Sequence, residues 1–171
     1  GDTYYNMGRY DDALRYFEES GPIFEKLNHL TGSAYYLGNV GMIYAKQGKD
    51  DMAKNNINEA IAILEELGDY YPISVYLTIM SDIYLKQNNF AAALSYTSRS
   101  LDLATAYSLK EQIGDANLQL SKLYEQAGNM NEAFFYYKNH ILYRDSLKNI
   151  NAIQQMADMR TDFEVSQKQI E

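Results

Sequence analysis

Four stretches of the sequence carry the same pattern, and each begins at the same interval after the one before it. They read YYNMGRYDDA from Tyr4, YAKQGKDDMA from Tyr44, YLKQNNFAAA from Tyr84 and YEQAGNMNEA from Tyr124, so the period is 40 (44 − 4 = 84 − 44 = 124 − 84). The repeated columns are Tyr4, Tyr44, Tyr84 and Tyr124; Gly8, Gly48, Asn88 and Gly128; and Ala13, Ala53, Ala93 and Ala133. A constant period of this length predicts an array in which each unit packs only on its neighbours.

Each unit has the pattern of a helix, a tight turn and a second helix. The Gly or Asn column marks a helix end, where the chain takes a left-handed residue. Acidic residues such as Asp51 follow it, and these suit the positive end of the next helix dipole. In that helix Ile57, Ala60, Ile61 and Leu64 form one apolar face with helical spacing. We therefore expect an all-α fold with turns near Gly8, Gly48, Asn88 and Gly128.

The second unit defines the motif most fully, through Leu37, Val40, Gly41, Tyr44, Gly48, Ala53, Ile57 and Ala60. At these offsets the sequence resembles the tetratricopeptide repeat, in which helix A and helix B form a pair. That repeat usually has about 34 residues, so the chain resembles the long type found in kinesin light chains. The resemblance implies a right-handed αα solenoid over residues 1–148, with repeats near 1–30 (truncated), 31–70, 71–110 and 111–148. It also implies a protein or peptide partner and no cofactor.

One unit departs from the pattern at Gly21 and Pro22, which fall inside the first helix B. Proline lacks a backbone donor and its ring clashes with the carbonyl four residues earlier. We therefore predict a kink or a short break in the helix between Asp11 and Leu27.

The repeat stops after Leu147, and residues 149–171 read as one further helix without Gly or Pro. Met156, Phe163 and Ile170 are evenly spaced at an interval of seven, with Ile153 three before the first, but Arg160 and Gln167 interrupt the second row. This is half of a coiled-coil seam. The helix either caps the last repeat by covering Tyr137 and Ile141, or it links the repeats to a following domain. Its distal part is expected to pair weakly with a second copy or to fray.

The passage YYKNHILYRDSLKNINAIQQMADMRTDFE resembles a junction in bacterial signalling proteins that place such repeats before a membrane helix and a histidine kinase, cyclase or DNA-binding output. The residues that carry this resemblance are Asp145, Ser146 and Leu147, followed by a long polar helix that ends near Phe163 and Glu164. Because the sequence opens inside a repeat, we expect it to have been cut from a longer protein. This resemblance implies a sensor region without an output domain of its own.

Composition excludes several classes of protein. The net charge of −8 argues against a general nucleic-acid binder, which needs clustered Lys and Arg. Cysteine is absent, so disulfides and thiolate metal sites are excluded, and the compartment stays open. No apolar run approaches the roughly 18 residues of a membrane span. His29 and His140 have no partner at metal-ligand spacing, and no catalytic motif is present. We therefore expect no enzymatic activity, no metal and no membrane insertion within this fragment.

The inner wall of the solenoid, lined by helix A, is the expected binding surface. Its candidate ligand-binding residues are Asn6, Tyr35, Asn39, Met42, Lys46, Asp82, Lys86, Gln119, Lys122 and Gln126. Asn6, Lys46, Lys86 and Gln126 form a polar column that could hold the backbone or carboxylate of an extended peptide. Solvated helix positions without a ligand would give the same pattern. The carboxylate clamp of chaperone-binding members is not reproduced, since only Asn39 fits it.

Two functions follow from these observations. The first is a non-catalytic protein- or peptide-binding module that serves as the sensor region of a bacterial signalling protein. The alternative is a free-standing scaffold that assembles a complex and has no output domain.

Overall fold

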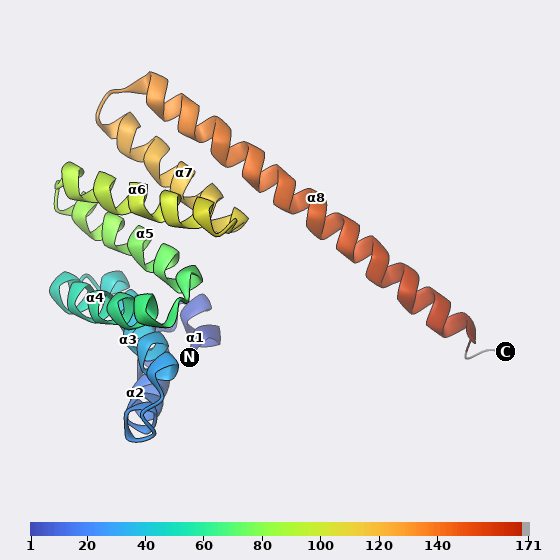
Figure 1. The fold of residues 1–171 in the computed structure, drawn as a ribbon, viewed down its shortest axis with the longest axis horizontal. Coiled ribbons are helices and arrows are strands. Elements are labelled where there is room, and N and C mark those ends of the chain that lie inside the picture. Colours follow the sequence, from blue (N-terminus) through green and yellow to red (C-terminus); the bar gives the residue numbers. More distant parts are fainter. Residues whose placement is uncertain (169–171) are drawn as a thin grey trace.

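The computed structural model of the chain describes the backbone of residues 1–168 and the side chains of residues 1, 3–151 and 154. In this part of the chain all regular structure is helical, and eight helices follow one another (Figure 1). They are α1 (Asp2–Asn6), α2 (Tyr10–Lys26), α3 (Leu30–Lys46), α4 (Asp50–Leu67), α5 (Tyr70–Lys86), α6 (Phe90–Ala106), α7 (Lys110–Gln126) and α8 (Met130–Lys168). Because α3, α5 and α7 start at positions 30, 70 and 110, and α2, α4, α6 and α8 at positions 10, 50, 90 and 130, the predicted all-α repeat array is confirmed.

The helices are joined by turns that all use the same device. A residue with a positive φ of 50 to 76° recurs at a constant interval of 20 (28 − 8 = 20, and likewise to 128), at Gly8, Asn28, Gly48, Gly68, Asn88, Ser108 and Gly128. The N–H of the next residue then bonds back to the fifth carbonyl before it, as Lys49 does to Tyr44 O at 2.9 Å. This closes the helix end and leaves no loop to order. The turns predicted at Gly8, Gly48, Asn88 and Gly128 are confirmed, and the turns between repeats work in the same way.

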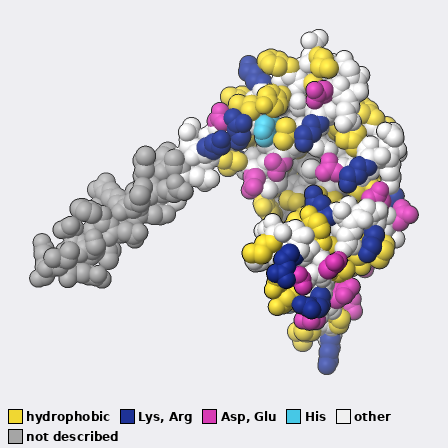
Figure 2. All heavy atoms as spheres, turned by 180° about the vertical axis from the view of Figure 1, so that it is seen from behind, with side chains coloured by type: hydrophobic (Ala, Val, Ile, Leu, Met, Phe, Trp, Pro, Cys, Tyr) yellow, Lys and Arg dark blue, Asp and Glu magenta, His cyan; other side chains and the backbone are white. Residues whose placement is uncertain are grey.

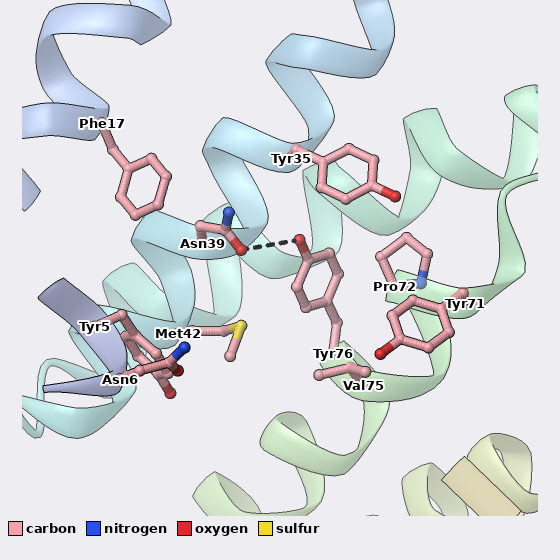
Figure 3. Close-up of a pocket in the computed structure, with 10 residues that line it drawn as sticks. All are labelled: Tyr5, Asn6, Phe17, Tyr35, Asn39, Met42, Tyr71, Pro72, Val75 and Tyr76. Carbon is pink, nitrogen blue, oxygen red and sulfur yellow. Dashed lines mark hydrogen bonds between the residues drawn. The ribbon is translucent and has the colours of Figure 1, made fainter. Parts of the chain in front are cut away.

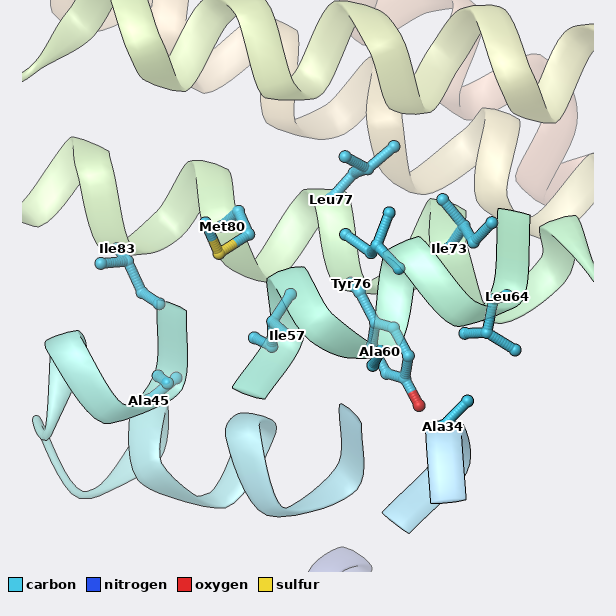
Figure 4. Packing of buried hydrophobic residues seen from close by; sticks show 12 residues of the cluster. Ala34, Ala45, Ile57, Ala60, Leu64, Ile73, Tyr76, Leu77, Met80 and Ile83 are labelled. Carbon is cyan, nitrogen blue, oxygen red and sulfur yellow. The ribbon is translucent and has the colours of Figure 1, made fainter. Parts of the chain in front are cut away.

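The centre of the core is the apolar face of α4, which packs between α3 and α5 (Figure 4). Ile57 and Leu64 of α4 are fully buried, as are Leu77 and Met80 of α5. Full burial of each such side chain stabilises the fold by about 1.5–3 kcal/mol. The core therefore runs from α3 through α4 to α5 and holds these two neighbouring repeats together.

Small residues let the two helices of a pair approach each other. A Cβ on Gly41 of α3 would lie 2.7 Å from Ile57 Cγ1 and 3.2 Å from Ala53 O of α4. One repeat later Ser81 takes this position and donates a hydrogen bond to Ala93 O at 3.0 Å. Ser121, one repeat further on, does the same to Ala133 O at 2.8 Å. The column therefore needs a residue that either has no side chain or can bond to the facing carbonyl.

Of the predicted kink or break near Gly21, the break does not occur, because α2 is helical without interruption from Tyr10 to Lys26. Two features explain why Pro22 is tolerated. The carbonyl that loses its partner belongs to Glu18, and both residues are exposed, so this carbonyl can tilt toward water. Gly21 is buried against the Tyr36 ring of α3, where a Cβ would lie 2.6 Å from the ring. Close packing holds the helix in place beside its proline.

The last helix does not end where the repeat does. Helix α8 runs unbroken for 39 residues, so residues 149–168 continue the second helix of the last pair and extend past the other helices (Figure 1). The position at which the next left-handed residue would fall is Lys148, which favours helix. The prediction that this segment caps Tyr137 and Ile141 is wrong, because both lie on the same continuous helix.

Several predictions about the tail concern side chains outside the described residues. These are the seam of Ile153, Met156, Phe163 and Ile170, the interrupting Arg160 and Gln167, and the pair Phe163 and Glu164. Where the structure describes α8, its apolar face is open: Met130 is 60% exposed, Phe134 69% and Tyr137 48%. Ile57 and Thr97, which correspond to Tyr137 in the preceding repeats, are fully buried. No further helix covers this end within the described residues.

Candidate functional site

A hollow of about 230 Å³ lies between α3 and α5, next to α1 (Figure 3). Its lining residues are Tyr5, Asn6, Phe17, Tyr35, Asn39, Met42, Tyr71, Pro72, Val75 and Tyr76. Seven of these ten belong to α3 and α5. Five of the ten carry aromatic rings and none carries a charge, so the hollow is suited to an apolar group. We call it the aromatic hollow.

Hydrogen bonds fix two of its tyrosines. The Tyr35 hydroxyl of α3 donates to Asp69 Oδ2 at 2.8 Å, which ties α3 to the residue that precedes α5. Burial raises the pKa of Tyr35 to about 12, and the bond to the Asp69 carboxylate adds to the shift. The Tyr76 hydroxyl donates to Asn39 Oδ1 at 3.5 Å across the hollow (Figure 3). A notch at Gly38 admits the Tyr76 ring, which a Cβ there would approach to 2.1 Å. The walls of the hollow are thus set by contacts between neighbouring helices.

A second hollow, of about 160 Å³, lies between α5 and α7. Its lining residues are Ser74, Val75, Thr78, Ile79, Gln112 and Asp115. Four of them are equivalents of aromatic-hollow residues one repeat earlier, since Tyr35 corresponds to Val75, Asn39 to Ile79, Pro72 to Gln112 and Val75 to Asp115. The two hollows are therefore successive positions of one groove along α3, α5 and α7. We call the second one the acidic hollow.

The acidic hollow carries negative charge at its edge. Asp115 is exposed, and Glu111 lies one turn before it on α7. Partial burial of its carboxyl and the charge of Glu111 raise the pKa of Asp115, while His140 and Lys122 oppose the shift. Beside it, Gln119 donates to Asp82 Oδ1 at 2.6 Å and links α7 to α5. The groove thus changes from aromatic and uncharged to polar and acidic within one repeat.

The structure brings only some of the predicted residues together. Asn6, Tyr35, Asn39 and Met42 line the aromatic hollow. Asp82 and Gln119 bond to each other, so their side chains are already partnered. Lys122 is exposed on α7. The polar column of Asn6, Lys46, Lys86 and Gln126 consists of the last residues of α1, α3, α5 and α7, and all four are exposed. Because its members are exposed and end their helices, this column forms a rim of the groove and not its floor. Lysine at a helix end also offsets the negative end of the helix dipole.

Sequence reasoning missed several residues of the aromatic hollow, namely Tyr5, Phe17, Tyr71, Pro72 and Tyr76. Tyr71 and Pro72 lie in the first turn of α5, where proline is accepted because the N–H has no helical partner. Seventeen tyrosines and no tryptophan were the available signal. A cluster of three tyrosines over residues 70–76 could have been recognised as a wall of this surface.

Charges of both signs are interspersed with hydrophobic side chains on the face shown in Figure 2. Among the described residues, no group of three His, Asp or Glu side chains is placed to hold a metal ion. None of the helices in the described part of the chain combines the length and apolar character that crossing a membrane requires. His140 has a structural partner, because its Nδ1 donates a hydrogen bond to Gly114 O at 2.9 Å.

The paired helices, the constant period and the groove along every second helix define a helical repeat protein of the αα-solenoid class. Family models described as tetratricopeptide repeat match residues 1–66 and residues 114–139. The chain belongs to the tetratricopeptide repeat family. Repeats of this family generally serve as non-catalytic modules that bind protein partners, and no enzymatic domain is evident in the described residues.

Solved structures show the same fold at low sequence identity. BtubC (BKLC) from P. vanneervenii is 17% identical with a TM-score of 0.71, and the match covers 85% of this chain and 60% of that one. The apo form of RapI is 19% identical with a TM-score of 0.59, covering 85% and 66%. MamA is 14% identical with a TM-score of 0.57, covering 87% and 96%. The chain thus spans less than two thirds of the length of the first two. A search of the curated proteins found no match.

Proposed function

We propose that this chain is a peptide-binding module whose ligand lies along the groove formed by α3, α5 and α7. The observation that carries the proposal is the aromatic hollow, because a largely apolar recess with a few polar groups, here the amides of Asn6 and Asn39, is typical of sites that hold a side chain. The net charge of −8 favours a protein ligand over a nucleic acid. Lys46 and Lys86 at the rim are suited to the ligand's backbone carbonyls or carboxylates.

Selection from a displayed library of random peptides tests this function directly. We expect enriched binders, and we expect Tyr71→Ala to weaken them because it removes one wall of the hollow. Tyr16→Ala is the matched control, since Tyr16 is 46% exposed and Tyr71 49%, and Tyr16 lies outside the hollow. A library that yields no binder would overturn the proposal.

The rim can be examined with the same binders. Lys46→Ala combined with Lys86→Ala should weaken capture of the peptides while leaving the melting temperature nearly unchanged, because exposed charges contribute little to stability. Equal capture by the double variant would remove the rim from the site.

Within a longer protein, the module would serve as the sensor region of a bacterial signalling protein, with α8 as the connecting helix. The resemblance around Asp145, Ser146 and Leu147 supports this role, as does the unbroken course of α8 beyond the repeats. A longer version of the protein should then change the activity of its output domain when a groove peptide is added.

A scaffold role is the second candidate, and the open apolar face of α8 favours it. Met130, Phe134 and Tyr137 are exposed next to a hollow that Ser121 and Glu125 also line. Such a face could join a partner or form a weak homodimer through α8. Sedimentation over a concentration series tests the homodimer, because a strictly monomeric chain would exclude pairing of two copies through this face.

A further inference from the structure

We propose that the groove selects a peptide carrying a large apolar side chain, best an aromatic one, followed about three residues later by Lys or Arg. This inference rests on the proposed function and names the class of ligand. The apolar side chain occupies the aromatic hollow, and the basic side chain reaches the acidic hollow.

The size and lining of the aromatic hollow determine the first half of the pattern. Its volume is about 230 Å³. This volume is several times the share of one water molecule, which is roughly 30 Å³. It is smaller than an ordinary ligand pocket, for which the range begins at roughly 300 Å³. The hollow therefore fits one side chain and not a cofactor, and the ring of Tyr71 and the side chains of Val75 and Met42 offer that side chain apolar contact.

A cation suits the aromatic hollow poorly. No carboxylate lines it, and burial of an unpaired charge is costly. Asp69, the carboxylate that is bonded to the lining residue Tyr35, already accepts the hydroxyl of that residue. An uncharged aromatic side chain has no such requirement, and it stacks on the exposed ring of Tyr71.

The acidic hollow determines the second half. Asp115 and Glu111 are both exposed on α7, and Gln112 adds an amide beside them. A Lys or Arg side chain can lay its apolar stem along Val75 and Ile79 while its charged end reaches Asp115. Negative charges one turn apart on α7 repel each other, and a basic partner relieves that repulsion.

The spacing comes from the repeat itself. The two hollows occupy equivalent places between α3 and α5 and between α5 and α7. Neighbouring helices pack about 8–10 Å apart, and an extended peptide advances about 3.3 Å per residue, so about three residues separate the two side chains.

Four fluorescein-labelled peptides that differ only at two positions test the pattern by anisotropy. Their variable pairs are Phe with Lys, Ala with Lys, Phe with Glu, and Lys with Lys, separated by two serines. The Phe–Lys peptide should bind about 10-fold or more tightly than the Ala–Lys peptide, because the aromatic ring is buried. It should bind about 5-fold more tightly than the Phe–Glu peptide, because the end charge is reversed.

Two variants of the protein assign these effects to the hollows. In Asp115→Asn the preference for Lys over Glu should shrink. Asp102→Asn removes the same charge from an exposed position on α6 and should leave the preference unchanged. Tyr71→Ala should reduce the preference for Phe over Ala, and Tyr16→Ala should not. The inference would be overturned if the Ala–Lys or the Lys–Lys peptide bound as tightly as the Phe–Lys peptide. It would also be overturned if Asp115→Asn and Asp102→Asn changed the preference for Lys over Glu equally.

The display selection keeps this result separate from the proposed function. Enriched peptides that show the aromatic–x–x–basic pattern support both. Enriched peptides that depend on Tyr71 but lack the pattern would overturn the inference and leave the groove as the binding site. A library without binders would overturn both.

Discussion

The helix pair α3–α4 and the helix pair α5–α6 occupy equivalent positions of the repeat. The contact between the two helices, however, has different chemistry in each pair. In the first, Gly41 faces Ile57, and both sides of the contact are apolar. In the second, Ser81 donates to Ala93 O at 3.0 Å and accepts from Thr97 Oγ1 at 2.7 Å. Ser81 and Thr97 are as deeply buried as Ile57.

The difference shows that the repeat maintains distance and not residue type. A glycine permits contact by leaving space, and a serine permits it by bonding to the carbonyl that a larger apolar group would meet. Each solution needs its own partner across the pair, because a buried hydroxyl without an acceptor is costly. The columns of the repeat are therefore coupled in pairs.

The largest test of this comparison is truncation of the two facing residues. We expect Ile57→Ala to lower the free energy of unfolding by about 3 kcal/mol, because it leaves a cavity in a fully buried contact. Thr97→Ala should cost about 1–2 kcal/mol, because it removes a hydrogen bond and one methyl group. Urea denaturation followed by circular dichroism measures both. Equal costs would show that the two contacts are not different in kind.

Exchange of the chemistry between the pairs tests the coupling. Gly41→Ser alone should cost about 2 kcal/mol, since its Cβ would lie 2.7 Å from Ile57 Cγ1. In the Ile57→Thr background the same change should cost at least about 1 kcal/mol less, because a Ser–Thr hydrogen bond then becomes possible. Strictly additive costs in the double-mutant cycle would contradict the pairing.

The turns of the two pairs give a smaller effect. Gly48 has φ 72° and Asn88, its equivalent, has φ 56°. Gly48→Val should cost about 1–2 kcal/mol, because a β-branched residue resists the left-handed region. Gly48→Asn should stay within about 0.5 kcal/mol, because asparagine tolerates that region and already occupies the other turn. A valine as harmless as asparagine would mean that this φ is not required.

The smallest effect concerns the junction between the two pairs at alkaline pH. Folding raises the pKa of Tyr35 from 10.0 to about 12, so the neutral phenol is favoured in the folded state. Its stabilising contribution is complete below pH 10 and is lost as the pH rises toward 12. Tyr35→Phe and Asp69→Asn should each flatten part of this loss in thermal melts. The equivalent positions, Val75 and Leu109, have no side-chain hydrogen bond to lose. If both variants lost melting temperature at alkaline pH as steeply as the unaltered protein, this account would be contradicted.

The sequence predicted the helices well because the columns that end and space them are local. A left-handed residue and an apolar face act within a few residues, so Gly48 and the row from Ile57 to Leu64 were enough. The turns at Asn28 and Ser108 were harder to recognise, because neither residue is glycine. The break that was one of the two outcomes expected at Pro22 does not occur. The exposure of Pro22 and the contact of Gly21 with Tyr36 depend on the neighbouring helix, which the local sequence does not show.

The lining of the aromatic hollow was predicted less completely than the helices, for a physical reason. A position within helix A shows which residues face inward, and Tyr35, Asn39 and Met42, which were expected to face inward, line one hollow. The shape of that hollow depends on side chains from α5, such as Tyr71 and Tyr76, and on how closely α3 and α5 approach. Such distances follow from packing and cannot be read from one helix alone.

The uniform turns have a consequence for how such a chain can change its length. Every joint has the same backbone form, so removal of residues 49–88 would place Asn89 directly after Gly48 and still leave a complete turn. Duplication or loss in steps of 40 therefore preserves every joint, whereas a step of 20 would exchange the two helices of each pair. Such an event instead disturbs the new contact between the helices on either side of the deletion. There Gly41 would face Thr97, which would have lost its hydrogen-bond partner Ser81. Growth of the array is thus limited by the match between adjoining columns and not by its connections.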